Sequence, residues 1–280
     1  MSEDFLEQMA RGSATRVVQA KARIPERDLR ARAASSPAPV PLALDAAGFD
    51  IIAEMKLRSP AAGQLGSVAD DSAGRVQGYA RAGAAAVSVL TEPSRFDGSM
   101  EHLADAARVL RSLRVPAMRK DFLVDPYQVL EARAAGAGGA LIILRMLADE
   151  QIEALLDCAR ETGLFALLEA FDAADIERAH DIVDERRHAP GQILVGVNCR
   201  DLTTLQVVPA RLLELAPLLP RSVPRVAESG VGSAADAARM ARAGYELALV
   251  GSALMTGSDP QGLLRELLAA GRHARHDWGA

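Results

Sequence analysis

Eight short apolar runs recur along the chain, and their spacing constrains the fold more than any other feature of the sequence. The runs are nearly continuous in apolar character, which is typical of strands buried on both faces of a parallel sheet. The ends of consecutive runs lie 23 to 35 residues apart, enough each time for one loop, one helix and one strand. The runs are Phe49–Lys56, Ala85–Thr91, Val115–Lys120, Ala140–Arg145, Phe165–Glu169, Ile193–Asn198, Arg225–Ser229 and Leu247–Ser252.

The segments between the runs carry helix start and stop signals. Asp125 is a candidate N-cap before Pro126, and proline suits the first position of a helix. Ala-Gly pairs at 82–83, 135–136 and 243–244 each precede an apolar run, as a glycine that ends a helix does before the next strand. Eight such units in succession predict an α/β fold, a (β/α)8 TIM barrel, rather than a doubly wound sheet.

The first 48 residues lie outside the eight units. Their apolar spacing indicates two short amphipathic helices broken near Gly12, and Pro25 then opens a further helical stretch through Arg32. We therefore expect residues 1–48 to form an N-terminal helical extension packed on the barrel. The barrel is expected to span residues 49–272, followed by a C-terminal tail of residues 273–280.

Composition excludes several classes of protein. The chain has 280 residues, which suits one barrel of roughly 250 residues with an extension. Its net charge of −5 argues against nucleic acid as a partner. We find neither an apolar leader nor an apolar run of about 18 residues, so we expect a cytoplasmic protein without membrane contact. These features leave the oligomeric state open.

Cysteine and histidine give no sign of a metal site. Cys158 and Cys199 form neither a metal-ligand pair nor a disulfide framework, in keeping with a reducing compartment. None of the five histidines ends a predicted strand. The sequence therefore predicts no metal ligand set and no histidine-based acid–base mechanism.

Polar side chains end all eight predicted strands, and strand ends converge on the active-site face of this kind of barrel. Glu54 lies two residues before Lys56, so both side chains point to the same side of their strand. Lysines and glutamates that meet in a low-dielectric mouth suit general acid–base chemistry on an anionic substrate, and structural salt bridges are the alternative. Five strands end in a charged or amide side chain, at Lys56, Lys120, Arg145, Glu169 and Asn198.

Two glycine-containing loops follow the last two predicted strands. They read Ser229-Gly230-Val231-Gly232-Ser233 and Gly251-Ser252-Ala253-Leu254-Met255. Glycine lets backbone N–H groups approach an anion, and the corresponding loops of such barrels frequently bind phosphate. We therefore expect a phosphate group here rather than two plain turns.

The residues that carry these features resemble those of the indole-3-glycerol phosphate synthase family of tryptophan biosynthesis. The resemblance covers essentially the whole barrel in order, and the Arg-Lys-Asp-Phe and Asn-x-Arg-Asp-Leu segments are the most specific. The matching segments are Ile52–Lys56 with Ser59-Pro60, Phe96–Ser99, Arg119–Phe122 with Asp125–Gln128, Leu168-Glu169, Gly196–Leu202, Ala227–Val231 and Val250–Ser252.

The resemblance implies a carboxy-lyase that needs no cofactor and no metal. Its members close the ring of 1-(2-carboxyphenylamino)-1-deoxyribulose 5-phosphate, releasing carbon dioxide and water, to give indole-3-glycerol phosphate. By matched position, Lys120 is the general acid of ring closure and Glu169 stabilises the cationic intermediate or takes part in dehydration. The division of acid and base duties between the Lys56/Glu54 and Lys120/Glu169 pairs stays open.

The remaining implied roles complete a substrate site. The catalytic set is Glu54, Lys56, Lys120, Glu169, Asn198 and Ser229. Substrate binding falls to Ser59, Phe96 and Arg200, and phosphate binding to Gly230, Gly251 and Ser252.

Departures from the family pattern, among them a longer extension of the fifth helix and a proline-rich stretch before the first strand, leave room for other activities. Ala61 stands where the family has a serine, and Cys199 stands where a small polar residue is more frequent. One alternative is therefore a paralogous phosphate-binding barrel with an altered substrate. Phosphoribosylanthranilate isomerase is such a barrel, but its cysteine and aspartate chemistry fits these residues poorly. The other alternative is a barrel without turnover.

Overall fold

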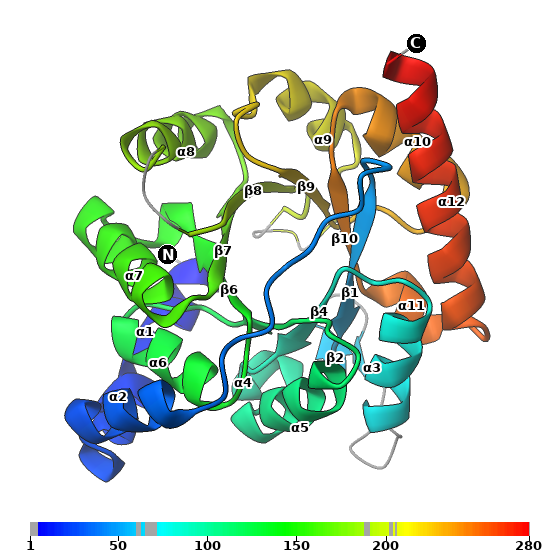
Figure 1. Ribbon diagram of the computed structural model, residues 1–280. Helices are drawn as coiled ribbons and strands as arrows, with labels where there is room; N and C mark the ends of the chain where they lie inside the picture. The colour runs from blue at the N-terminus through cyan, green and yellow to red at the C-terminus, as the bar shows by residue number, and fades with distance from the viewer. Residues whose placement is uncertain are drawn as a thin grey trace.

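Eight parallel strands close into a barrel, as the spacing predicts (Figure 1). The computed structural model describes residues 5–59, 63–64, 72–187, 191–201, 204 and 206–279, without the side chains of Ser59 and of residues 276–279. Around the barrel the order is β1-β10-β9-β8-β7-β6-β5-β4, and β4 pairs with β1. The strands are β1 (Asp50–Met55), β4 (Ala86–Leu90), β5 (Ala117–Lys120), β6 (Gly139–Ile143), β7 (Phe165–Ala170), β8 (Ile193–Asn198), β9 (Arg225–Glu228) and β10 (Leu247–Val250).

Helices surround the barrel, and shorter elements lie in the loops between strands and helices (Figure 1). The larger helices are α3 (Ser72–Arg81), α5 (Met100–Arg111), α6 (Pro126–Ala134), α7 (Asp149–Thr162), α8 (Ala173–Glu185), α9 (Ala210–Leu215), α10 (Ala234–Ala243) and α12 (Pro260–Gly279). The shorter elements are β2 (Arg58–Ser59), β3 (Gly63–Gln64), α4 (Pro93–Phe96), η1 (Leu144–Met146), η2 (Ala216–Leu218) and α11 (Ser252–Thr256).

The residues predicted to begin and end the helix after β5 do so in the structure. The carboxylate of Asp125 accepts a hydrogen bond from the backbone N–H of Tyr127 at the start of α6. At the other end, Gly136 adopts φ +90°, a left-handed conformation that glycine takes without steric cost. These local signals fix where α6 begins and ends, and so place the loop between β5 and α6.

Two apolar clusters hold the barrel together. The inner cluster fills the barrel with side chains such as Ile52, Met118 and Leu247. The outer cluster, which includes Ile51, Val87 and Val195, lies between the strands and the helices. Both faces of each strand are therefore buried, which explains the continuous apolar runs of the sequence.

The N-terminal extension differs from the prediction in one respect. The expected break at Gly12 is wrong, because α1 is a single helix over Phe5–Arg23. Glycine inside a helix costs about 1 kcal/mol relative to alanine, a small penalty for a helix with a packed face. Leu6, Met9 and Val17 bury that face on both sides of Gly12, so tertiary packing carries the helix through. The second helix, α2 (Glu26–Ser35), packs against α6.

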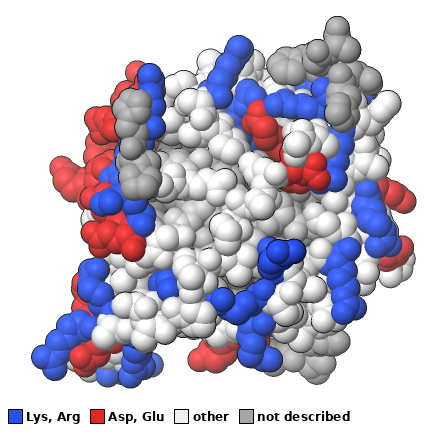
Figure 2. Space-filling model, viewed as in Figure 1, with Lys and Arg blue, Asp and Glu red and all other residues white. Residues whose placement is uncertain are grey.

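The segment between α2 and β1 crosses the amino-terminal end of the barrel (Figure 1). Leu42 of this segment is buried in the inner apolar cluster. Figure 2 shows the same face, where charged side chains gather mainly around the periphery. The inner cluster is thus covered at this end, and the opposite end carries the strand-end residues of interest.

Two observations bear on the chain as a whole. Over the described residues, every helix is too short or too polar to span a bilayer. The helix α12 continues to Gly279 across residue 272, where the sequence suggested the start of a tail. The division into extension, barrel and tail stays a proposal.

Candidate active site

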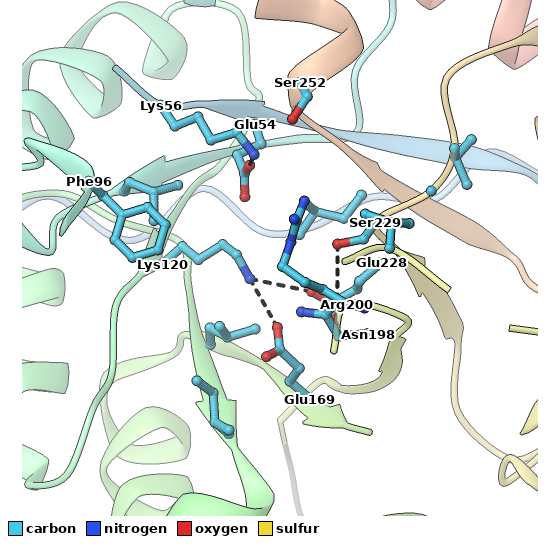
Figure 3. Close-up of a pocket in the computed structure, with 18 of the residues that line it drawn as sticks. Glu54, Lys56, Phe96, Lys120, Glu169, Asn198, Arg200, Glu228, Ser229 and Ser252 are labelled. Atoms are coloured by element: carbon cyan, nitrogen blue, oxygen red, sulfur yellow. Dashed lines mark hydrogen bonds and ion pairs between the residues drawn. The ribbon is translucent and has the colours of Figure 1, made fainter. Parts of the chain in front are cut away.

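A pocket of about 420 Å³ lies at the carboxyl-terminal ends of the strands (Figure 3). Its lining includes charged side chains, glycines and aromatic rings. The structure brings eleven of the twelve predicted site residues to this pocket: Glu54, Lys56, Phe96, Lys120, Glu169, Asn198, Arg200, Ser229, Gly230, Gly251 and Ser252.

Glu54 and Lys56 form a close ion pair at the end of β1. Lys56 Nζ lies 2.7 Å from Glu54 Oε1, and Glu54 is 3% exposed. The two-residue alternation of the strand places both side chains in the mouth, as predicted. Burial opposes ionisation of Glu54, but the charges of Lys56 and Lys120 outweigh it and hold its pKa below the ordinary 4.5. Glu54 is therefore a carboxylate at neutral pH.

Lys120 ends β5 and stands between two buried carboxyl groups (Figure 3). Its Nζ lies 3.0 Å from Glu169 Oε2 and 3.4 Å from Glu228 Oε2. Burial would lower the pKa of Lys120, but the neighbouring glutamates reverse this and raise it above the ordinary 10.5. The Lys120 side chain is consequently a fixed ammonium ion in the middle of the pocket.

Glu228 is a charged pocket residue that the sequence analysis missed. It is 1% exposed, and its Oε1 has no hydrogen-bond partner among the described residues. Burial and the nearby charge of Glu169 raise its pKa well above 4.5, although Lys120 acts in the opposite direction. The two-residue alternation of β9 could have revealed it. The prediction took Ser229 as the last polar residue of the strand, whereas the side chain that points into the barrel mouth belongs to the residue before it, Glu228.

Asn198 connects the ends of β8 and β9. Its Oδ1 accepts a hydrogen bond of 2.9 Å from Ser229 Oγ and one of 3.0 Å from the backbone N–H of Arg200. Ser229 adopts φ +67°, a left-handed conformation that is rare outside glycine. These bonds hold the turn after β9, which begins the first glycine-containing loop.

Both glycine-containing loops border the pocket, and the second lies beside the Glu54–Lys56 pair. Gly230 has φ +72°, and an added Cβ would lie 3.1 Å from Cys199 Sγ. At Gly251 an added Cβ would lie 2.3 Å from Glu54 Oε1 and 3.1 Å from Lys56 Nζ. Gly251 is therefore required for room around the ion pair as well as for access to its own backbone. Ser252 is the first residue of α11 rather than the end of β10.

Aromatic side chains from separate elements form one wall of the pocket. Phe5 of α1 meets Phe122 edge to face, with ring centroids 5.9 Å apart. Phe96 of α4 lies against the same Phe122 ring, at 6.1 Å. The N-terminal extension thus contributes directly to the pocket, through Phe5 and Leu6.

One residue predicted at a strand end lies elsewhere, and the side chain of one predicted site residue is not described. Arg145 was expected at a strand end among the converging groups, and this is wrong. It lies in η1, outside the residues that line the pocket, and pairs with Asp175 and Asp172. Its strand ends two residues earlier, so the side chain turns away towards α8. The side chain of Ser59 lies outside the described part of the structure, as does Ala61.

No group of three potential metal ligands occurs among the residues that the structure describes. Among the described residues, the pocket lining offers two ammonium groups and a guanidinium together with five carboxyl groups, of which those of Glu54, Glu169 and Glu228 contact the lysines. Such a set can bind an anionic substrate, donate protons and stabilise charge that develops during a reaction.

Comparison with known proteins assigns this arrangement to a family. The family model described as indole-3-glycerol phosphate synthase matches residues 6–267. A protein of that name from Parafrankia sp. (strain EAN1pec) is 44% identical over 230 residues, covering 82% of this chain and 81% of the relative. Another of that name, from Mycobacterium tuberculosis (strain CDC 1551 / Oshkosh), is 39% identical over 270 residues, covering 96% and 95%.

Solved structures agree with the barrel fold. Thiamine phosphate pyrophosphorylase from Pyrococcus furiosus superposes with a TM-score of 0.56 at 17% identity, over 81% of this chain and 96% of that chain. For 3-hexulose-6-phosphate synthase from Salmonella typhimurium the TM-score is 0.61 at 12% identity, over 80% and 99%. At such identities the likeness concerns the fold alone.

Proposed function

The chain belongs to the indole-3-glycerol phosphate synthase family, and from this premise we propose how its pocket carries out the family's reaction. The substrate is a phosphorylated small molecule, 1-(2-carboxyphenylamino)-1-deoxyribulose 5-phosphate. The ring carbon that bears the carboxylate attacks the ketone carbon, and one carbon–carbon bond forms. The carboxylate then leaves as carbon dioxide, and the former carbonyl oxygen leaves as water.

One observation carries the proposed mechanism: the ammonium group of Lys120 lies between two buried carboxyl groups. When the ring closes, negative charge develops on the carbonyl oxygen. A fixed ammonium stabilises that charge in the transition state, where the interaction is strongest. The alkoxide that forms is itself a strong base, so it takes a proton even from an ammonium with a raised pKa.

Glu169 and Glu228 are proposed to divide the proton transfers around Lys120. Ring closure leaves a cationic nitrogen in the substrate, and a carboxylate at Glu169 stabilises that charge. Glu228, whose pKa is raised by burial and by Glu169, carries a proton over a wider pH range than an ordinary carboxyl group. It is suited to return a proton to Lys120 after the first step, because the two groups are in contact.

The Glu54–Lys56 pair is proposed to serve the anthranilate carboxylate and the dehydration. Lys56 offers a positive charge next to Gly251 at the phosphate side of the pocket. Glu54 is held ionised, so it is available as a base when the hydroxyl leaves. Asn198, Arg200 and Ser229 orient the substrate from the ends of β8 and β9, as their shared hydrogen bonds support.

The phosphate is proposed to bind the loops after β9 and β10, at Gly230, Gly251 and Ser252. The aromatic wall then faces the phenyl ring of the substrate. We propose no cofactor and no metal for this reaction. A cytoplasmic location without nucleic-acid or membrane partners is our further expectation, in line with two buried free cysteines and the acidic composition.

The direct test is turnover of the purified chain with the carboxyphenylamino-deoxyribulose phosphate, followed by indole fluorescence. We expect indole-3-glycerol phosphate to form in proportion to enzyme and time. Glu169→Gln is expected to lower kcat by about 10²–10⁴-fold with a smaller change in KM. Absence of product with the wild-type chain, under conditions where an established member of the family turns over, would favour the barrel without turnover.

A further inference from the structure

We propose that Arg16 is a positioning residue whose guanidinium, held between two buried carboxylates, fixes the aromatic wall of the pocket. The inference rests on the proposed function, because that wall faces the aromatic ring of the substrate. Arg16 lies on α1 and points towards the strand ends. Its Nη2 is 2.7 Å from Asp121 Oδ1, and its Nη1 is 3.4 Å from Glu92 Oε1.

The two carboxylates follow neighbouring strands. Glu92 comes two residues after β4, and Asp121 comes directly after β5. Their side chains are 0% and 1% exposed, and buried carboxylates are costly unless a positive charge compensates them. Asp121 also meets Arg119 at 3.2 Å, but that guanidinium is shared with Glu131. Arg16 therefore places a positive charge next to Glu92. The same guanidinium is the second positive charge beside Asp121, in addition to that of Arg119.

Glu92 controls the first ring of the wall. Its carboxylate accepts hydrogen bonds from the backbone N–H groups of Ser94 and Arg95, at 2.9 and 2.7 Å, and so caps α4. Phe96 is the last residue of α4 and lines the pocket. A shift of the Glu92 carboxylate would therefore move Phe96.

Asp121 controls the second ring and adjoins the proposed general acid. The oxygen that receives Arg16 also accepts a 2.8 Å hydrogen bond from the backbone N–H of Phe122. The other oxygen accepts from Thr91 Oγ1 at 2.8 Å. Lys120 immediately precedes Asp121 in the chain, so the same carboxylate fixes the backbone between Lys120 and Phe122.

The third ring comes from α1 itself. Phe5 meets Phe122 edge to face, and Phe96 lies on the same Phe122 ring. One guanidinium thus joins the three elements that carry the three rings. The helix has other ties, such as the hydrogen bond from Gln128 Nε2 to Ser13 Oγ, so loss of the Arg16 charge alone leaves α1 attached.

The test uses Arg16→Met in the full-length chain, since methionine keeps an unbranched stem and removes the charge. We expect KM for the carboxyphenylamino-deoxyribulose phosphate to rise about 10-fold or more, with a smaller change in kcat. Backbone amides of the first half of α1 and of α4 should exchange with deuterium faster than in the wild type, whereas those of α8 should not. Arg27→Met is the matched control, because Arg27 is 87% exposed and forms a surface ion pair with Asp28.

A double-mutant cycle with Phe5→Ala distinguishes positioning from general weakening. Phe5→Ala should raise KM in the wild-type background and add little in the Arg16→Met background, because the ring is then already displaced. Arg16→Lys should give an intermediate KM, since a single ammonium cannot span both carboxylates as a guanidinium does.

Two results would overturn the proposal. One is a wild-type KM in Arg16→Met with unchanged exchange of α1 and α4. The other is full additivity of Arg16→Met and Phe5→Ala. If the wild-type chain forms no indole-3-glycerol phosphate, the proposed function fails, and deuterium exchange still reports whether Arg16 holds α1 and α4.

Discussion

Oε1 of Glu228 lies so close to Gly196 that a methyl group added to this glycine would stand 2.2 Å from it. The glycine is on β8 and pairs with Val226 of the neighbouring β9, and the side chain of Glu228, two residues further along β9, lies over it. The carboxyl group of Glu228 therefore occupies the space that a side chain at position 196 would fill. Gly251 stands in the same relation to Glu54, at 2.3 Å.

Gly196→Ala is expected to displace the Glu228 carboxyl group and to lower kcat by about 10- to 100-fold, as misplacement by about 1 Å can do. Shortening the acid in the double variant Gly196→Ala/Glu228→Asp should recover the thermal stability lost in the single variant. Steady-state kinetics and thermal unfolding measure both effects. If Gly196→Ala keeps the wild-type kcat and unfolding temperature, the carboxyl group of Glu228 can move aside without loss, and the prediction is wrong.

Glu228→Gln is expected to stabilise the fold at neutral pH, by about 1–3 kcal/mol in the free energy of unfolding. Because the folded-state pKa of Glu228 is raised above 4.5, the folded state binds more protons than the unfolded state above that pH. Glu228 therefore lowers the free energy of unfolding. This loss is absent below about pH 4.5 and increases as the pH rises. The gain from glutamine should follow the same course in urea unfolding measured from pH 4 to pH 8.

Glu54→Gln provides the control of opposite sign. The folded-state pKa of Glu54 is lowered, so its ionisation contributes stability that is present above about pH 4.5 and is lost as the pH falls through the folded-state pKa. The glutamine variant should therefore be less stable than the wild type at pH 7 and closer to it at pH 3. The same direction of change in both variants would contradict the charge assignments in the pocket.

Lys120→Ala is expected to lose about 10²-fold or more in kcat, because the ammonium that stabilises the carbonyl oxygen is gone. Lys120→Arg should restore little, since a planar guanidinium cannot take the position of the compact ammonium between Glu169 and Glu228. Single-turnover kinetics would separate ring closure from product release. Near-native turnover in the arginine variant would reduce the role of Lys120 to a fixed charge and make Lys56 the first candidate for the acid.

Gly251→Ala is expected to raise KM for the phosphorylated substrate and to lower kcat together, because the methyl group meets the Glu54–Lys56 pair. Gly12→Ala is the contrasting glycine substitution: an added Cβ at Gly12 lies 3.9 Å from Arg16 Nη1 and meets ordinary space. It should stabilise α1 by about 0.5–1 kcal/mol without changing kcat. An unchanged kcat in Gly251→Ala would mean that the ion pair shifts freely.

The sequence predicted the barrel and most of the pocket because both depend on local periodicity. The order of eight apolar runs implies a closed parallel sheet, and the two-residue alternation of β1 places Glu54 beside Lys56. At β6 and β9 the strand ends before the expected residue, and there the prediction failed. Glu228 was missed for this reason, and Arg145 was wrongly assigned to the mouth.

Contacts between distant segments left no local signal. Arg16 and Asp121 are 105 residues apart, and nothing in the α1 sequence indicates a partner after β5. The continuity of α1 through Gly12 has a similar origin, since the packing that carries it comes from the barrel. Such features depend on the tertiary structure, and only the folded chain reveals them.

The covered amino-terminal end of the barrel has a consequence for how substrate enters and products leave the enzyme. With the inner cluster packed and Leu42 buried in it, we expect the barrel to offer no second route through its centre. Substrate, carbon dioxide, water and indole-3-glycerol phosphate then all pass the same opening, which Phe5 and Leu6 border. Departure of the large product and arrival of the next substrate then become mutually exclusive events.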